Sequence, residues 1–233
     1  MAKIPVITVD GPSGTGKGTI CCYLATKLNW HLLDSGALYR LVALAANQQS
    51  VALEDEAKLA RLAASLDLKF VIMSDNAGVS ALLEGKDVSL EIRTESCGNA
   101  ASMLAALPAV RESLFHHQQK FRQAPGLIAD GRDMGTIVFP DAELKIYLTA
   151  SAEERAKRRY KQLKEKGINV NLRGLSADIA ERDKRDKERK VSPLKPAEDA
   201  IVIDTTGSDV DVVIRQVSAL VCSRFADLAA FVL

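Results

Sequence analysis

The sequence predicts an α/β fold in which a parallel β-sheet is flanked by helices. Short apolar, β-branched runs recur along the chain and alternate with stretches of helical periodicity. The first of these runs ends in a glycine-rich loop that leads into a helix. The chain has 233 residues, 47% of them hydrophobic, which is enough to bury a sizeable core. We therefore expect one domain over residues 1–233, interrupted by insertions.

The glycine-rich loop has the composition of a phosphate-binding loop. It lies between the apolar run 4–10 and the helical stretch 19–28. Its glycines adopt backbone angles that other residues avoid, so its N–H groups and the positive helix end can face an anion. Lys17 can reach the β- and γ-phosphates of a nucleotide. The nine residues expected to hold these phosphates are Gly11, Pro12, Ser13, Gly14, Thr15, Gly16, Lys17, Gly18 and Thr19.

One residue of this loop departs from the usual pattern. A Ser or Thr commonly follows the lysine and meets magnesium through its hydroxyl, whereas here Gly18 follows Lys17 and Thr19 comes one place later. The departure weakens the case for a direct magnesium ligand in the loop and favours the small nucleotide kinases. A glycine-rich turn without a ligand is the alternative, and the strand, the helix and Lys17 together argue against it.

The segment after the first helix predicts two more helices and then a series of short strands. Residues 31–36 form a short, polar-ended run, and helices are expected over 37–48 and 55–66. Three short β-like runs follow, over 68–73, 80–83 and 88–92, with turns at 75–78 and 84–87. We interpret residues 67–93 as a small antiparallel sheet inserted into the α/β chain, and call this segment the β insert.

The rest of the chain returns to the α/β pattern. Helices are expected over 95–106 and 110–122, because Pro108 separates them and Pro125 ends the second. Short apolar strands are expected over 127–130, 144–148 and 201–204. Further helices are expected over 152–166, 175–190 and 210–232.

The charge of the chain is concentrated in one segment. The net charge is only +1, so no general affinity for nucleic acid follows. Residues 153–190 hold 14 Lys and Arg against 8 Asp and Glu, a net charge of +6. We call this segment the lid region, after the role that a family resemblance described below implies for it.

Several other protein classes are disfavoured. The four cysteines show neither metal-ligand spacing nor a disulfide framework, and the chain enters a strand with no charged-then-apolar leader. Both observations favour a reducing cytoplasm. No apolar run approaches the ~18 residues of a membrane span. Nothing in the sequence requires more than a monomer.

The remaining candidate residues suit phosphoryl transfer, which needs alignment and charge stabilisation rather than a catalytic base when the acceptor is a phosphate. Asp130 ends a buried strand, where such proteins commonly place a carboxylate in the magnesium shell, and we expect it to act through water. The residues after it, 131–135, carry paired glycines and adjacent opposite charges, as a ligand site at a strand end would. An ordinary surface turn with a salt bridge is the alternative.

Arginines supply the positive charge. Arg155, Arg158 and Arg159 lie on the first charged helix, and Arg182, Arg185 and Arg189 share one face of the second. Asp186 lies one turn from Arg182 and can orient it. A solvated charged helix is the alternative, but planar guanidinium groups beside a phosphate loop suit phosphate clamps.

The chain resembles the bacterial cytidylate kinases nearly end to end. The resemblance is carried by GPSGTGKGT at 11–19, LLDSGALYR at 32–40, EGKDVSLEIRT at 84–94, IADGRDMGTIVFPDA at 128–142, ERDKRDKERKVSPLKPA at 181–197 and IVIDTT at 201–206. The DSGALYR and ADGRDMGT segments distinguish it from adenylate kinases. The resemblance implies ATP-dependent phosphorylation of CMP and dCMP to CDP and dCDP, with Mg²⁺ as Mg-ATP. It also implies that the β insert encloses the acceptor and that the lid region covers the phosphates.

The resemblance assigns roles to individual residues. The phosphate loop binds ATP, Arg40, Arg132 and Arg189 meet the acceptor phosphate, and Arg182 and Asp186 lie by the sugar. Those that surround the cytosine are Ser35, Ser102, Arg111 and Asp133. The catalytic charges are Lys17, Arg132, Arg159, Arg182 and Arg189. The chemistry agrees with this assignment, because a carboxylate can accept from the cytosine amino group while arginine and serine donate to N3 or O2.

Two other function classes stay open. One is a kinase on the same core that acts on uridylate, thymidylate or a metabolite alcohol, against which Asp133 and Arg111 argue. The other is a nucleotide-binding switch with no acceptor, against which the arginines and the β insert argue. A panel of acceptors distinguishes them.

Overall fold

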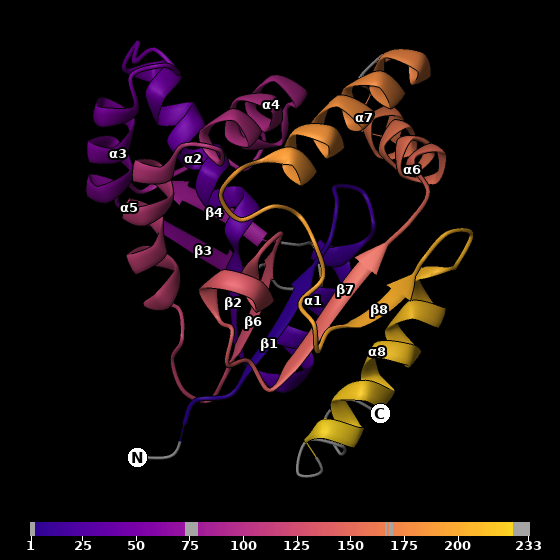
Figure 1. Ribbon diagram of the computed structural model, residues 1–233. Coiled ribbons are helices and arrows are strands. Elements are labelled where there is room, and N and C mark those ends of the chain that lie inside the picture. Colours follow the sequence, from indigo (N-terminus) through magenta and orange to yellow (C-terminus); the bar gives the residue numbers. More distant parts are fainter. Residues whose placement is uncertain (1–2, 73–78, 166, 168–169, 226–233) are drawn as a thin grey trace.

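A five-stranded parallel sheet forms the centre of the fold, as the sequence predicts. The computed structural model describes residues 3–72, 79–165, 167 and 170–225. The strands run in the order β2–β6–β1–β7–β8, and every neighbouring pair is parallel (Figure 1). Their bounds are β1 Val6–Asp10, β2 His31–Asp34, β6 Leu127–Gly131, β7 Leu144–Thr149 and β8 Ile201–Asp204. Because β1 and β6 are buried along their whole length, they appear in the sequence as apolar runs.

Parallel pairing brings the carboxyl ends of the strands to one edge of the sheet. Asp10 of β1 lies beside Gly131 of β6, and Asp34 of β2 lies beside Asp130 of β6. The glycine-rich loop leaves β1 at this edge, and residues 132–135 leave β6 there. Open α/β sheets bind ligands at this edge.

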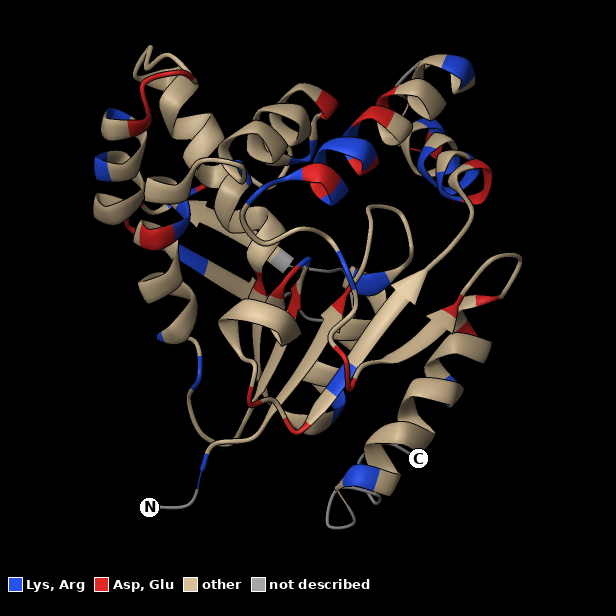
Figure 2. Ribbon diagram, viewed as in Figure 1, with Lys and Arg blue, Asp and Glu red and all other residues tan. Residues whose placement is uncertain are grey.

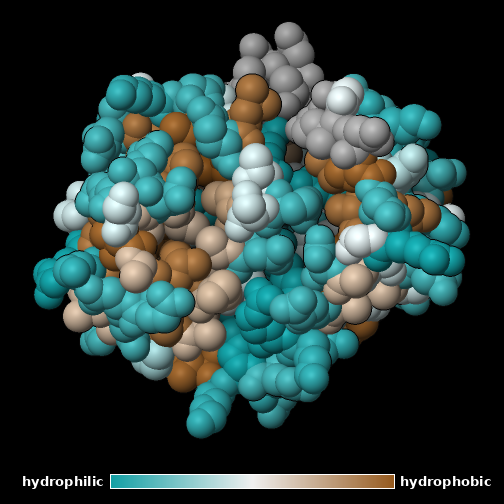
Figure 3. Space-filling model, turned by 90° about the horizontal axis from the view of Figure 1, so that it is seen from above, coloured by the Kyte–Doolittle hydropathy of each residue, from teal (hydrophilic) through white to brown (hydrophobic). Residues whose placement is uncertain are grey.

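The two helices of the lid region lie beyond the same edge. They are α6 Ala152–Glu165 and α7 Leu172–Glu188. Figure 1 shows the strand arrows pointing towards them, and Figure 2 shows lysine and arginine gathered along both helices. Seen from that side, hydrophilic residues fill the middle of the surface (Figure 3). Asn171 caps α7 by accepting from the Arg173 N–H, so α7 begins three residues earlier than the expected 175.

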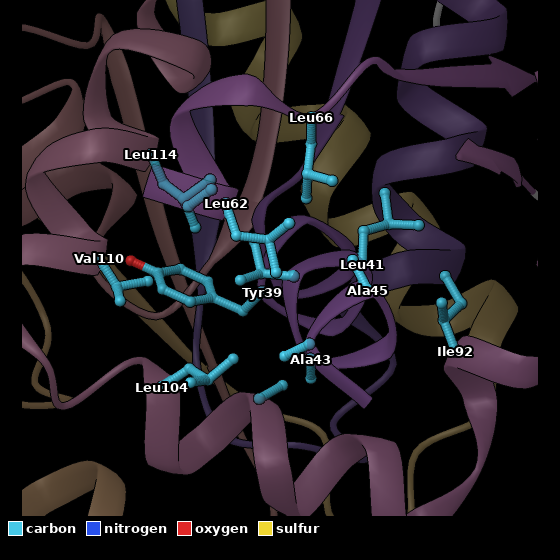
Figure 4. Packing of buried hydrophobic residues seen from close by; sticks show 14 of the residues in the cluster. Tyr39, Leu41, Ala43, Ala45, Leu62, Leu66, Ile92, Leu104, Val110 and Leu114 are labelled. Atoms are coloured by element: carbon cyan, nitrogen blue, oxygen red, sulfur yellow. The ribbon is translucent and has the colours of Figure 1, made fainter. Parts of the chain in front are cut away.

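Helices cover both faces of the sheet. One face carries α1 Lys17–Leu28 and α8 Val210–Arg224, which pack on β1, β6 and β7. Beyond the other side, a second apolar cluster (Figure 4) joins four helices, α2 Ser35–Gln48, α3 Glu56–Ser65, α4 Glu95–Leu104 and α5 Pro108–Gln119. Within the described residues, no helix is both long and apolar enough to cross a lipid bilayer.

The β insert is an antiparallel sheet of three strands, as the sequence predicts, but its third strand was misplaced. The strands are β3 Leu68–Ile72, β4 Val79–Leu83 and β5 Lys86–Asp87. The expected strand at 88–92 is wrong. Asp87 accepts from the Ser89 N–H at 2.9 Å and turns the chain, so that Glu91–Arg93 forms the 3₁₀ helix η2. The expected turn at 75–78 lies outside the described residues.

Three further differences concern local structure. Residues 31–34 form the edge strand β2, which the polar ends of this run concealed. Residues 134–138, expected as part of a loop, form the single π-helical turn η3 Met134–Val138. The helix expected over 210–232 ends at Arg224, and its residues from 226 onward lie outside the described chain.

Gly11 is predicted to be irreplaceable at the start of the phosphate loop. Its φ is +144°, and a Cβ there would lie 2.0 Å from the Leu148 carbonyl oxygen of β7. We expect Gly11→Ala to lower the free energy of unfolding by about 2 kcal/mol or more. Gly174→Ala is the control, because no atom lies within 4 Å of its Cβ position in α7, and alanine there should leave stability equal or higher. Urea unfolding measures both, and equal losses would contradict the steric argument.

Candidate active site

The loop between β1 and α1 has the geometry of an anion cradle. Gly14 and Gly16 have φ of +83° and +92°, which L-residues rarely adopt. Lys17 is the first residue of α1, and its ammonium donates to the Pro12 carbonyl at 2.7 Å, so it arches back over the loop. Burial lowers the pKa of Lys17 to about 7, and the nearby Arg132 guanidinium acts in the same direction. An anion in the cradle would restore the charged form.

A cavity of about 570 Å³ opens beside this loop. It is bounded by the loop, α2, the β insert, the end of β6 and both helices of the lid region. It collects five of the predicted positively charged residues from separate parts of the chain: Lys17, Arg40, Arg132, Arg159 and Arg182. The loop residues that line it are Ser13, Gly14, Gly16, Lys17, Gly18 and Thr19. Gly11, Pro12 and Thr15 do not line it and shape the loop from behind.

A second, narrower cavity of about 40 Å³ continues from the first, with which it shares Gly36, Arg132 and Arg182. It contains all the predicted acceptor-binding residues that the first cavity lacks: Ser35, Ser102, Arg111, Asp133, Asp186 and Arg189. These six come from α2, α4, α5, α7 and the chain just after β6 and α7. The structure therefore brings every predicted acceptor-binding residue to one of two adjoining cavities.

An ion pair lines the narrow cavity. Asp133 is 3% exposed and pairs with the Arg111 guanidinium, which also lies over the Tyr39 ring at 6.0 Å from its centroid. Burial raises the pKa of Tyr39 to about 12, so its hydroxyl remains protonated. Tyr39 also lines this cavity, although nothing in the sequence distinguished it from a core aromatic residue.

Asp186 is the acidic centre of the arginine cluster. Its carboxylate accepts from Ser102 Oγ at 2.9 Å and from Arg132 Nε at 3.3 Å. Burial acts to raise the pKa of Asp186, but Arg132 and the other nearby guanidinium groups outweigh it and hold the pKa below its usual value. Asp186 was expected to orient Arg182. The two side chains attract each other electrostatically, but the Asp186 carboxylate accepts its arginine hydrogen bond from Arg132.

Two arginines of this cluster carry buried N–H groups that have no hydrogen-bond partner among the described residues. They are Nε of Arg182 and both Nε and Nη2 of Arg189. Burial and the neighbouring Arg132 and Arg40 lower the pKa of Arg182 to about 9. Buried donors almost always have an acceptor, so a cluster of cations with unused donors suits an anionic ligand.

The six lid-region arginines that the sequence singled out lie in distinct environments. Arg159 lines the large cavity and donates to Glu95 at 2.6 Å, which ties α6 to α4. Arg155, 3% exposed, donates to the carbonyls of Ala150 and Ser13 and pairs with Asp183. Arg158 binds the chain after β8 through Thr205. The predicted common face of Arg182, Arg185 and Arg189 is only partly functional, since Arg185 lines neither cavity and pairs with the exposed Glu181.

Asp130 has the surroundings that a magnesium shell requires. It ends β6 inside the large cavity, and its Oδ2 lies 3.7 Å from the position that a Gly18 Cβ would occupy. Burial raises the pKa of Asp130, opposed by Lys17, so a cation would stabilise the ionised form. Asp34 and the Thr19 side chain line the same cavity, and these oxygen donors suit Mg²⁺. No three His, Cys, Asp or Glu residues cluster as an all-protein metal site within the described chain.

Comparison with known proteins identifies the family. A profile of the cytidylate kinase family matches residues 7–223. The chain belongs to the cytidylate kinase family. It is therefore a kinase, a phosphotransferase. The cytidylate kinase of Aeromonas salmonicida is 59% identical over 226 residues, and that of Shewanella loihica is 56% identical over the same length. Each alignment spans 97% of this chain, and 97% and 98% of the two relatives, respectively.

A likeness of fold extends further. A crystal structure of an uncharacterised protein from Eubacterium ventriosum superposes with a TM-score of 0.52 over 95% of this kinase and all of that chain, at 11% identity. At that identity the likeness concerns the fold alone. The sequence resemblance and the parallel-sheet prediction are confirmed, and the assignment of individual site residues stays a prediction.

Asp186 is predicted to stabilise the empty cluster of arginines. Asp186→Asn leaves Arg132 and its neighbours without their buried counter-charge, and we expect a loss of roughly 3 kcal/mol in unfolding free energy. Glu181→Gln, one turn away on α7, breaks a pair whose carboxylate side chain is 73% exposed and should cost less than about 1 kcal/mol. Urea unfolding of both variants tests this, and comparable losses would show that Asp186 has no special electrostatic role.

Proposed function

We propose that this kinase transfers the γ-phosphoryl group of ATP to CMP and dCMP, giving CDP and dCDP. The observation that carries the proposal is the pair of adjoining cavities. One is lined by a phosphate loop and the other by a buried carboxylate–guanidinium pair, Asp133 with Arg111. A nucleoside triphosphate and a nucleoside monophosphate placed in the two cavities would meet at Arg132 and Arg182, which line both.

The positive residues supply alignment and charge stabilisation. Lys17 and the loop would hold the ATP phosphates, while Arg40, Arg132 and Arg189 would hold the acceptor phosphate. Arg159 and Arg182 would neutralise the charge that develops on the moving phosphoryl group. The acceptor phosphate is already ionised near neutral pH, so it attacks in line without a protein base and without a covalent enzyme intermediate.

Asp130 and its neighbours Thr19 and Asp34 would hold Mg²⁺ with the triphosphate, Asp130 acting through water. When bound, the ion would supply positive charge that lowers the mutual repulsion of the phosphates. The support is the set of oxygen donors at one edge of the sheet and the raised pKa of Asp130.

The narrow cavity would select the base. Asp133 would accept from the cytosine amino group, and Arg111 and Ser35 would donate to the ring acceptors. Ser102 would also lie by the base, and Asp186 and Arg182 would lie by the sugar. Uracil places a carbonyl where cytosine has its amino group, so it would face the Asp133 carboxylate unfavourably.

The β insert and the lid region would enclose the two substrates. Phe70, Ala81 and Ile92 of the insert and Arg159 and Gln162 of α6 all line the large cavity. Closure would exclude water from the phosphoryl group. We also propose that the enzyme works as a monomer in the cytoplasm. Four free cysteines and the absence of a membrane-spanning helix among the described residues support that location.

A panel of acceptors tests the activity. ADP release from ATP, coupled to an optical assay, would be measured with CMP, dCMP, UMP, TMP and simple alcohols. We expect turnover with CMP and dCMP to exceed that with the others. A uridylate, thymidylate or alcohol preference would replace the proposed acceptor, and nucleotide binding without any acceptor activity would favour a nucleotide-binding switch.

Asp133 is predicted to set the choice of base. Asp133→Ala removes an attraction for CMP and a repulsion for UMP, so the CMP/UMP ratio of kcat/KM should fall. A hydrogen bond to a charged group contributes about 1.5–3 kcal/mol, which corresponds to a decrease of about tenfold to hundredfold. Glu112→Ala is the control. It removes an exposed acidic side chain of α5 next to Arg111 and should leave the ratio unchanged. Equal losses with both acceptors would assign Asp133 a structural or sugar-side role.

A further inference from the structure

A carboxylate from β1 holds the segment that follows β6. Asp10 is the last residue of β1 and is 5% exposed. Its Oδ1 accepts from the Met134 N–H at 2.9 Å, and its Oδ2 accepts from the Gly135 N–H at 2.8 Å. Both oxygens are therefore committed to two successive backbone donors. Because Met134 and Gly135 are themselves buried, water cannot readily take the place of the carboxylate.

These two donors are the first N–H groups of η3. The first N–H groups of a helical turn have no partner within it, and an aspartate at the N-cap position commonly accepts them with its own side chain. Asp133 occupies that position but makes no such bond. Its carboxylate is instead turned to Arg111 in the narrow cavity.

One carboxylate of Asp133 cannot both cap η3 and face a ligand in the cavity. We propose that Asp10 is a positioning residue for acceptor recognition: it caps η3 in place of Asp133 and so keeps the Asp133 carboxylate directed into the narrow cavity. This inference rests on the proposed function, in which Asp133 recognises the base. Asp10 touches neither cavity and acts only through the backbone of residues 134 and 135.

The position of Asp10 gives this contact a second effect. Asp10 directly precedes Gly11, the first residue of the phosphate loop, and pairs in register with Gly131. The same side chain therefore ties the segment carrying Arg132 and Asp133 to the start of the loop that cradles the triphosphate. The two substrate-binding segments are held at a fixed offset by a pair of hydrogen bonds, in addition to the sheet.

A double-mutant cycle tests the inference through base choice. Asp10→Asn keeps one acceptor oxygen but sets an amide NH₂ against the second backbone donor, which frees Asp133 to turn onto η3. We expect the CMP/UMP ratio of kcat/KM to fall at least tenfold, mainly through KM for CMP, while KM for ATP changes less than threefold. In an Asp133→Asn background, Asp10→Asn should lower the ratio no further, because its effect acts through Asp133.

Glu143→Gln is the matched control. Its carboxylate accepts from the Val6 N–H at 2.8 Å at the opposite end of β1, so it makes the same kind of bond without touching η3. We expect its ratio to equal that of the wild type. A fall in the ratio that adds to that of Asp133→Asn, or a folded Asp10→Asn with an unchanged ratio, would overturn the inference.

A crystal structure of Asp10→Asn supplies a readout independent of catalysis. We expect the Asp133 carboxylate within hydrogen-bonding distance of the Met134 or Gly135 nitrogen and its pair with Arg111 broken. An intact Asp133–Arg111 pair in this variant would overturn the inference, whatever the base preference of the wild type. A wild type with no preference for CMP would count against the proposed function alone. Asp10→Ser, which retains a smaller acceptor, is measured in the same way and decides the question should Asp10→Asn not fold.

Discussion

The parallel pairing of β1 with β6 is the constraint on which the rest of the structure depends. Its register sets Asp10 beside Gly131, so the phosphate loop and the segment bearing Arg132 and Asp133 leave the sheet as neighbours. The two strands are more than a hundred residues apart in sequence, and the chain between them contributes residues of α2, α4, α5 and the β insert to the two cavities. The chain thus supplies cavity-lining residues from the phosphate loop near its start and from the segments in its middle.

Charge is the second constraint, and it is only partly balanced by the protein. Arg132, Arg182 and Arg189 gather around the buried carboxylate of Asp186, and several of their donors have no acceptor among the described residues. Such crowding costs stability in the absence of a ligand. A phosphate group entering between these residues supplies both the charge and the acceptors, so the arrangement favours binding over the stability of the empty enzyme.

Much of the fold could be predicted because its elements have strong local patterns. Apolar runs predicted β1, β6 and β7, and the glycine-rich sequence around Lys17 predicted the loop before α1. The polar-ended strand β2 and the π-turn η3 lacked such patterns, since each is defined by contacts with distant residues rather than by its own sequence. The third strand of the insert was misplaced because Asp87 turns the chain through a side-chain bond that apolar periodicity does not reveal.

The sequence could predict which residues belong to the candidate site, but not how they are arranged within it. Family resemblance named residues that the structure brings to two adjoining cavities. Helical spacing could not distinguish Arg182, which faces the cavities, from Arg185, which pairs with Glu181. Nor could it separate Arg159, which lines the large cavity, from Arg155, which is buried against the loop.

Arg155 has a mechanical consequence. Its guanidinium binds Ser13 of the phosphate loop, Ala150 at the foot of α6 and Asp183 of α7, so loop, sheet and both helices converge on one side chain. If the helices tilt relative to the sheet, they would pivot about this side chain. With 14 residues α6 is about 21 Å long, and a tilt of about 10° at that pivot carries its far end about 4 Å. Small adjustments around a triphosphate in the proposed site would thereby be amplified into a larger movement of Arg159 and Gln162 towards or away from the reacting groups.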